Sequence, residues 1–552
     1  MAKEKYVLGI DFGTDSVRTV VMDALGGKEV STHVAVFKRW SEGNFCDPEK
    51  NQFRQHPLDH IESLIESVTE ALDKAGKEKG RNVIGIGIDT TGSTPAPVDR
   101  DGNVLALLDE FEANPNAMFI LWKDHTALRE AEEINRAAKG WPENDYTKYE
   151  GGVYSTEWFW SKILHVLRED KSVAEAAYSW VEHADWVPAL LTGDTRPQKI
   201  KRSRCAAGHK AMWHTEWGGL PPEDFLKSID PMLSGLRERL YTHTHTSDTK
   251  AGNLSGEWSQ KLGLPEGIAV AVGAFDAHMG AVGAEIEEKT FVKILGTSSC
   301  DIVVAPKAVA EGKLVAGICG QVDGSVIPGM IGLEAGQSSF GDVYAWFRDI
   351  LYWPVEELFE GQEEKKLHIL NQIIPRLTQE AEKIEPSQTG LLALDWLNGR
   401  RTPYADQALK GAIAGLTLGT TAPKIFRALV EATALGAQAI VERFRDEGID
   451  IEKVVGIGGI SQKSPFVMQV LADVMDMPVK VSASQQSVAL GAAMFGAVAA
   501  GLYGDIKMAQ QRMGSGFAAT YNPDKERAAF YKELYKKYRK LGASLEDQLR
   551  EL

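Results

Sequence analysis

A single carboxylate, Asp276, lies in the segment 273–280 (GAFDAHMG), between an apolar run and a stretch of small residues. The run 268–272 is typical of a buried strand, and the glycines and alanines that follow favour a closely packed helix. A carboxylate at a strand-to-helix turn lies near the positive end of the helix, so it could accept a proton from a bound alcohol. Taken alone, capping of the helix is the simpler interpretation, because aspartate is a preferred capping residue.

Two short polar turns, each between two apolar runs, could hold phosphate groups. The first, 13–16 (GTDS), opens the chain, and the second, 296–299 (GTSS), lies just past its middle. Both offer backbone N–H groups beside hydroxyls, which suits phosphate oxygens. Asp11 ends the strand before the first turn, where its carboxylate could hold Mg²⁺. Either turn alone could be an ordinary hairpin, but the pair predicts two related lobes that face each other.

Groups suited to a small hydroxylated ligand occur in the first half of the chain. A predicted buried strand, 83–89, ends in the loop 90–97, and ligands of open α/β sheets bind beyond the carboxyl ends of strands. The segment 122–124 (WKD) places an aromatic face beside a cation and a carboxylate, a combination suited to a polyol. The aromatic residues of 154–164 are predicted to belong to the core.

The segment 208–214 (GHKAMWH) carries two histidines and a lysine. His209 and His214 have no third ligand nearby in the sequence, so we do not expect a metal site there, and we expect Lys210 to donate to a hydroxyl. Further on, Glu334 interrupts an apolar stretch of small residues. The pair 458–459 (GG) ends a predicted strand before a helix, which would let a flat ring lie close to the backbone.

Composition limits the classes of function. The chain has 552 residues, 43% hydrophobic and 25% charged, which is enough for two lobes with cores of their own. A net charge of −16 without a basic block argues against nucleic acid or an anionic membrane as a partner. The sequence has no C-x-x-C pair, no signal-peptide pattern and no apolar run long enough to cross a bilayer, so we expect a cytoplasmic protein. The tail from 522 onward predicts an amphipathic helix, which is compatible with a homodimer.

Taken together, these segments identify the chain as a member of the FGGY carbohydrate kinase family. The resemblance also rests on 11–18 (DFGTDSVR), 91–97 (TGSTPAP), 114–125 (NPNAMFILWKDH), 185–193 (DWVPALLTG), 332–346, 394–403 (LDWLNGRRTP) and 456–464, which follow in the expected order. It implies an α/β fold of two ribonuclease-H-like (actin-like ATPase) lobes with a central cleft. Residues 1–286 would form the sugar-binding lobe, with the first phosphate turn and the catalytic aspartate, and residues 287–552 the ATP-binding lobe.

The resemblance also implies roles for individual residues, with Asp276 as the catalytic base. The implied sugar contacts are Ala96, Trp122, Asp124, Lys210 and Glu334; the implied nucleotide contacts are Gly13, Thr14, Arg18, Gly296, Thr297, Gly341, Gly458, Gly459 and Lys463; Asp11 would hold Mg²⁺. Two departures from the family pattern are Thr126, where many members have arginine, and the missing third glycine after Gly459.

The reaction that the resemblance implies is the ATP-dependent phosphorylation of L-ribulose at its 5-hydroxyl, a step of L-arabinose catabolism. A kinase for another ketopentose, such as D-xylulose, is the nearest alternative. An actin-like ATPase that binds no sugar, either a filament protein or a chaperone, is the alternative from another class.

Overall fold

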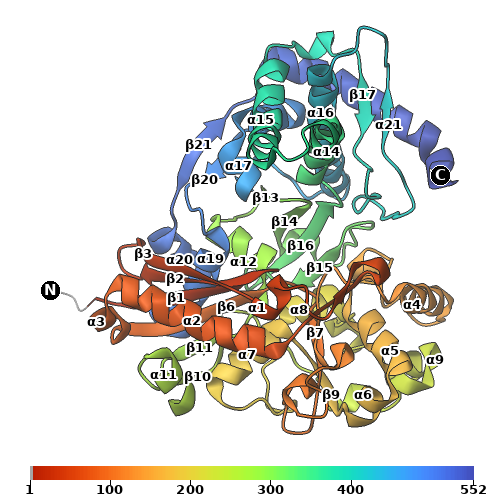
Figure 1. Cartoon of the computed structure of the whole chain (residues 1–552). Helices are drawn as coiled ribbons and strands as arrows, with labels where there is room; N and C mark the ends of the chain where they lie inside the picture. Colours follow the sequence, from red (N-terminus) through yellow and green to blue (C-terminus); the bar gives the residue numbers. More distant parts are fainter. Residues whose placement is uncertain (1–3, 552) are drawn as a thin grey trace.

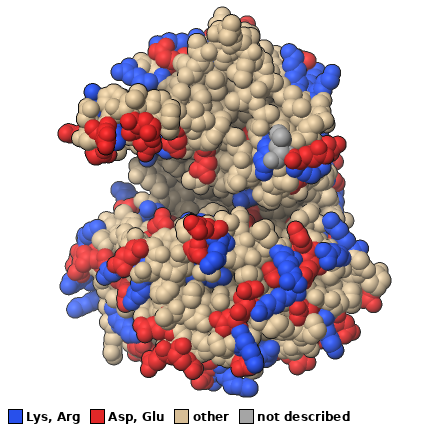
Figure 2. Space-filling view, turned by 45° about the vertical axis from the view of Figure 1, so that its right-hand side comes forward, with Lys and Arg blue, Asp and Glu red and all other residues tan. Residues whose placement is uncertain are grey.

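In the computed structural model, which describes residues 4–551, the chain forms two lobes with a cleft between them (Figure 1; Figure 2). The first lobe is built on a seven-stranded sheet with the order β10-β11-β6-β1-β2-β3, in which β12 also pairs with β6. Its strands are β1 (Tyr6–Phe12), β2 (Ser16–Asp23), β3 (Glu29–Val36), β6 (Val83–Thr90), β10 (Lys250–Asn253), β11 (Ala269–Ala271) and β12 (Ala274–Phe275). The central strands β1 and β6 are parallel and almost wholly buried, which explains their continuous apolar sequences.

The second lobe repeats the same arrangement. Its seven strands follow the order β15-β16-β14-β13-β19-β20-β21. They are β13 (Thr290–Leu295), β14 (Ser299–Pro306), β15 (Gly320–Asp323), β16 (Met330–Gln337), β19 (Lys453–Ile457), β20 (Val479–Ser482) and β21 (Phe517–Tyr521). In both sheets an antiparallel hairpin, β1–β2 or β13–β14, lies beside a parallel strand, β6 or β19. The two hairpins predicted around the polar turns are therefore confirmed, and they hold equivalent places in the two lobes.

Long helices cover the sheets. On the first sheet, α2 (Pro57–Ala75) packs on β2 and β3; the second lobe has α14 (Gly341–Leu358), α15 (Glu363–Glu382), α16 (Ala422–Asp446), α18 (Pro465–Met475) and α21 (Lys525–Glu551). The helix predicted for the tail is α21. Its apolar face, which includes Tyr531, Leu534 and Tyr538, is buried against its own lobe.

A helical part with its own core extends the first lobe. It contains α4 (Leu128–Gly140), α5 (Phe159–Glu169), α8 (Arg204–Lys210) and α9 (Glu223–Ile229), with the short strands β5 (Gln52–Gln55), β8 (Phe119–Ile120) and β9 (Ser179–Glu182). The helix α7 (His183–Thr192) and the strand β7 (Pro95–Val98) lie beside this part but pack into the core of the first sheet. Phe159 and Trp160 are fully buried in this core, as predicted. Across residues 4–551, none of the helices has the length and apolar character that a membrane span needs.

Two helices made of small residues join the lobes at the base of the cleft. They are α12 (Asp276–Gly283) and α19 (Ser487–Ala499), and α19 also packs on β1 and β6 of the first lobe although it lies in the sequence between β20 and β21 of the second lobe. A Cβ atom at Gly283 would lie 1.9 Å from the carbonyl oxygen of Ser487, and one at Gly491 would lie 1.9 Å from that of Met279. Only glycine permits this approach, so the contact fixes the start of α12, and Asp276 with it, at the floor of the cleft.

The remaining α-helices and strands are short. They are α1 (Lys38–Ser41), β4 (Cys46–Asp47), α3 (Lys77–Gly80), α6 (Lys171–Ala176), α10 (Leu236–Arg239), α11 (Gly256–Leu262), α13 (Lys307–Ala310), β17 (Leu392–Leu394), β18 (Ala412–Ala414), α17 (Gly459–Lys463) and α20 (Ile506–Met513).

Candidate active site in the cleft

A cavity of about 500 Å³ lies in the hollow between the lobes that Figure 2 shows. Its walls include residues from both polar turns and from both lobes: Gly13, Thr14, Trp122, Glu150, Glu157, Trp158, Lys210, Asp276, His278, Gly296, Thr297, Cys300, Glu334 and Arg401. The volume is in the range of small-molecule sites. The structure thus brings together both turns, the candidate base and three of the five predicted sugar contacts.

Asp276 is the first residue of α12 and faces the cavity. Phe275 holds the N-cap position, and the Oδ1 atom of Asp276 accepts a hydrogen bond from the N–H of Ala277 at 2.6 Å. Burial, and then the negative charge of Asp11, raise the pKa of Asp276 to about 7. A carboxylate with this pKa can exchange a proton near neutral pH, which is what a general base requires.

Two more carboxylates lie side by side at the ends of the central strands of the first sheet. Asp11 on β1 is in register with Asp89 on β6 and with Arg18 on β2, whose guanidinium lies 3.5 Å from Asp11 Oδ2. Asp89 is fully buried, and within residues 4–551 no N–H or hydroxyl group donates to either of its oxygens. Burial, and then Asp11, raise the pKa of Asp89 well above its ordinary value. Two such carboxylates can share a proton or hold a divalent cation.

A buried ion pair connects the lobes at one wall of the cavity. Lys210, at the end of α8, donates from Nζ to Glu334 Oε1 on β16 at 2.9 Å, and its ammonium lies 4.9 Å from the ring centre of Trp158. Although burial opposes the charge of both groups, Lys210 lowers the pKa of Glu334 to about 2, and Glu334 raises that of Lys210. Both groups are therefore charged, and both face the cavity, where hydroxyl groups could bind them.

Of the other three predicted sugar contacts, one lines the cavity and two lie outside its walls. Trp122 lines the cavity and donates from Nε1 to Thr14 Oγ1 at 3.0 Å, which joins it to the first turn. Asp124 is fully buried away from the cavity walls; its carboxylate pairs with Arg54 and accepts from Thr126 Oγ1 at 2.6 Å. Ala96 is buried on β7 and also lies outside the lining residues.

The predicted nucleotide contacts gather around the second turn. The N–H of Gly341, at the start of α14, donates to the carbonyl of Gly296 at 3.1 Å. Gly458 follows β19 with a φ of +92°, and a Cβ atom there would lie 2.6 Å from the carbonyl of Leu295. Gly459 opens α17 and Lys463 ends it, and both are exposed. In the first turn Gly13 and Thr14 line the cavity, whereas Arg18 extends toward Asp11.

Several residues of the cavity walls were not predicted as contacts. Glu150 is buried, accepts from the N–H of Met212 at 2.7 Å, and has a pKa raised well above its ordinary value by burial. Arg401 reaches the cavity from the second lobe, and Glu157, which pairs with His125 at 2.9 Å, lines it from the first. The sequence signal for Arg401 was its place in the segment 394–403; Glu150 has no local signal.

Comparison with known proteins identifies the class. The N-terminal domain model of the FGGY family of carbohydrate kinases matches residues 6–283, and the C-terminal domain model matches residues 291–500. The chain belongs to the FGGY family of carbohydrate kinases, and it is therefore a phosphotransferase. This confirms the family that the sequence segments indicated.

Named relatives cover almost the full chain. The chain is 50% identical to a ribulokinase of Vibrio parahaemolyticus over 98% of its own length and 96% of the relative's, and 38% identical to one of Halalkalibacterium halodurans over 97% and 94%. Among solved structures, a xylulose kinase of Rhodospirillum rubrum superposes with a TM-score of 0.80 at 21% identity, covering 99% of this chain and 100% of that one. Glycerol kinase of Plasmodium falciparum with ADP gives a TM-score of 0.74 at 18% identity, covering 97% and 98%. These likenesses confirm the predicted two-lobed actin-like fold.

Proposed function

We propose that this chain transfers the γ-phosphoryl group of ATP to the 5-hydroxyl of L-ribulose, giving L-ribulose 5-phosphate. The observation that carries the proposal is one cavity in which a carboxylate with a pKa of about 7 faces both glycine turns and a charged lysine–glutamate pair. The ribulokinase names of relatives up to 50% identical over nearly the whole chain support the choice of sugar.

In the proposed reaction Lys210 and Glu334 bind hydroxyl groups of the sugar and hold its terminal hydroxyl against Asp276. Asp276 accepts the hydroxyl proton as the oxygen attacks the γ-phosphorus, and ADP leaves. The N–H groups of Gly13 and Gly296 donate to carbonyls within their own turns, so the other backbone N–H groups of the two turns would stabilise the charge on the phosphate oxygens. Because the reactants would be held together in one cavity between the lobes, most of the rate enhancement would come from positioning and charge stabilisation.

The carboxylates of Asp11 and Asp89 fit a hard divalent cation such as Mg²⁺. Asp89 is fully buried and Asp11 is half-buried, both offer oxygen ligands, and Asp89 has no donor within residues 4–551 to satisfy it. Bound there with the nucleotide, Mg²⁺ would neutralise phosphate charge. The nearby positive guanidinium of Arg18 would attract the phosphates and so keep them close to these carboxylates.

The organisation of the chain is part of the proposal. We place the boundary between the sugar-binding and ATP-binding parts near residue 287, with α19 and α20 packed against the first lobe. The reaction is assigned to the cytoplasm, which the four free cysteines of the described chain support. A homodimer is compatible with this arrangement.

The pH dependence should follow the titration of Asp276. The base is active when deprotonated, and its pKa is raised to about 7, so kcat/KM for L-ribulose should fall about tenfold per pH unit below pH 7 and level off above it. Steady-state rates between about pH 5 and 9, with excess Mg²⁺ to hold the ionisation of ATP constant, would measure this. A profile that stays level down to about pH 5, as expected for an aspartate with the ordinary pKa of 3.8, would contradict the assignment.

Alanine substitutions of two neighbouring glycines test where the nucleotide binds. A Cβ atom at Gly459 meets no atom within 4 Å in the described chain, so Gly459→Ala should leave the thermal unfolding midpoint unchanged. If adenosine lies against this backbone, the same methyl group should raise KM for ATP about tenfold without changing L-ribulose affinity. Gly458→Ala is the comparison, since its φ of +92° and the carbonyl of Leu295 should cost about 1 kcal/mol or more of stability. An unchanged KM for ATP in Gly459→Ala would place the nucleotide elsewhere.

Identification of the product tests the proposed function as a whole. The protein would be incubated with ATP, Mg²⁺ and L-ribulose, and the product examined by ³¹P and ¹³C NMR. Coupling of phosphorus to C5 is the expected result. Phosphate on another carbon, or ATP hydrolysis without a sugar phosphate, would contradict the proposal.

A further inference from the structure

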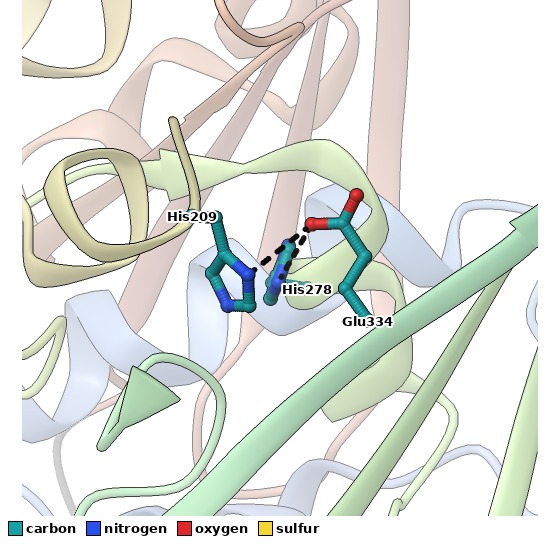
Figure 3. Close-up of side chains that lie close together, drawn as sticks. All are labelled: His209, His278 and Glu334. Atoms are coloured by element: carbon teal, nitrogen blue, oxygen red, sulfur yellow. Dashed lines mark ion pairs between the residues drawn. The ribbon is translucent and has the colours of Figure 1, made fainter. Parts of the chain in front are cut away.

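Three side chains that are far apart in the sequence meet beside the cavity (Figure 3). His209 comes from α8, His278 from α12 and Glu334 from β16 of the other lobe. The Oε2 atom of Glu334 lies 3.5 Å from His209 Nδ1 and 3.7 Å from His278 Nε2, and the three atoms all lie within 4.8 Å of one another. Figure 3 shows the two rings on one side of the carboxylate, directed at the same oxygen.

These atoms are buried, and their hydrogen-bonding capacity is unused. Among the described residues, His209 Nδ1, both ring nitrogens of His278 and Glu334 Oε2 have no hydrogen-bond partner. Burial lowers the pKa of both histidines, that of His278 to about 4, so both rings are neutral. A buried polar atom without a partner costs free energy, and here three of the four, His209 Nδ1, His278 Nε2 and Glu334 Oε2, converge on one point.

The surroundings orient the group for a ligand. His209 Nε2 lies 3.0 Å from Ser325 Oγ, whose own hydroxyl donates to the carbonyl of Val322. Nε2 therefore carries the proton, and the lone pair of Nδ1 points toward Glu334. A Cβ atom at residue 320 would lie 2.0 Å from Nδ1, so only glycine at that position leaves this nitrogen open. Lys210 binds the other carboxylate oxygen, Oε1, and leaves Oε2 free.

Two neutral imidazoles and one carboxylate form a ligand set that transition metals prefer. Zn²⁺ commonly has three protein ligands of this kind and an open fourth position, and metal-bound histidines are usually fixed by a hydrogen bond from the other ring nitrogen. Mg²⁺ prefers oxygen ligands alone, so the cluster is distinct in chemistry from the pair Asp11 and Asp89. The open position would face the cavity, which His278 and Glu334 line.

We propose that His209, His278 and Glu334 form a binding site for a divalent transition metal such as Zn²⁺, and that the metal and the sugar exclude each other there. The second half rests on the proposed function, in which Glu334 binds the sugar. Because the ligands come from both lobes, a bound metal would also link the lobes across the cleft.

Cobalt titration of the full-length protein, first freed of metal with a chelator, tests the site without any assay of activity. Co²⁺ bound by two histidines and a carboxylate should give the visible absorption bands of a four- or five-coordinate ion, saturating at one equivalent, and Zn²⁺ should abolish them by displacement. L-ribulose added to the cobalt form should reduce the bands. Calorimetric binding of L-ribulose to the metal-free protein tests the proposed function separately.

Variants identify the ligands. His278→Asn and Glu334→Gln should each weaken metal binding by at least about tenfold, and Ser325→Ala, which frees the His209 tautomer, should weaken it by about tenfold. His214→Ala is the matched control, since His214 lies five positions from His209 but outside the cluster and should bind Co²⁺ normally. Circular dichroism would confirm folding, and two independent ligand variants keep the test decisive if one misfolds.

The outcomes distinguish between the two parts of the proposal, the metal site and its mutual exclusion with the sugar. Absence of one-equivalent cobalt binding, or binding unchanged in both His278→Asn and Glu334→Gln, would overturn the metal site. Cobalt bands that persist at saturating L-ribulose would overturn the exclusion. If the metal-free protein does not bind L-ribulose at all, the proposed function fails while the metal site stands on its own titration.

Discussion

Asp276→Asn is expected to lower kcat by about 10²–10⁴-fold, the usual contribution of a general base. The affinity for L-ribulose should stay within about threefold, because asparagine has nearly the same shape and can still accept the hydrogen bond from Ala277 that the carboxylate accepts. The amide cannot take the proton of the attacking hydroxyl. ADP release measured at saturating substrates gives kcat, and calorimetry gives the sugar affinity.

Asp505→Asn is the matched control for this variant. Asp505 caps α20 through a hydrogen bond from the N–H of Met508 at 2.7 Å and lies outside the cavity walls. Asparagine caps helices about as well as aspartate, so this variant should keep normal turnover and stability. If Asp276→Asn also kept normal turnover, Asp276 would be a residue of the helix start and not the base.

Lys210→Met is expected to lower the free energy of unfolding by about 3–5 kcal/mol and to abolish measurable L-ribulose binding. Glu334 has a pKa of about 2 because Lys210 pairs with it, although burial opposes the charge; without Lys210 a buried carboxylate would remain unpaired. The double variant Lys210→Met with Glu334→Gln should recover most of the stability but not the sugar binding, since neither charged group would remain. Urea titration measures the stability and calorimetry the binding.

Lys171→Met controls for the loss of a lysine as such. Lys171 pairs with Glu175 at 3.6 Å, and both side chains are largely exposed. Exposed pairs contribute about 0–1 kcal/mol, so this variant should be close to the wild type. If the single variant Lys210→Met and the double variant lost the same free energy of unfolding, Lys210 would not stabilise the protein through its ion pair with Glu334.

Local sequence patterns were sufficient to predict several of the elements that line the cavity. The apolar runs around 13–16 and 296–299 predicted both hairpins, and the small residues after Asp276 predicted α12, because hydrophobic periodicity and glycine content are local properties. The two hairpins also indicated that the two lobes have sheets of related design. Each turn was predicted on its own side of the cleft, and both line the cavity.

Contacts that depend on register or on the approach of distant segments could not be predicted. Asp89 ends a strand that the sequence shows plainly, but its place beside Asp11 requires the parallel register of β1 and β6. His209 was compared with His214, its neighbour in sequence, whereas the fold brings it to His278 and Glu334. No local sequence pattern predicts that such distant residues lie next to each other in the fold.

Asp124 shows a related difficulty. Its segment was typical of a polyol contact, but the carboxylate pairs with Arg54, seventy positions earlier in the chain. Thr126, at the position where many family members have arginine, donates to the same carboxylate. The residue type was correct for ligand chemistry, and only the tertiary structure shows that Asp124 is fully engaged within the protein.

The release of ADP from Mg·ATP in the presence of single sugars tests the central claim most directly. The sugars to compare are D- and L-ribulose, D- and L-xylulose, L-arabinose and glycerol, each at the same concentration. The proposed function predicts the largest kcat/KM for L-ribulose and little ADP without sugar. A larger kcat/KM for D-xylulose or glycerol would contradict the substrate assignment, and ADP release that no sugar stimulates would contradict the assignment of a sugar kinase cavity.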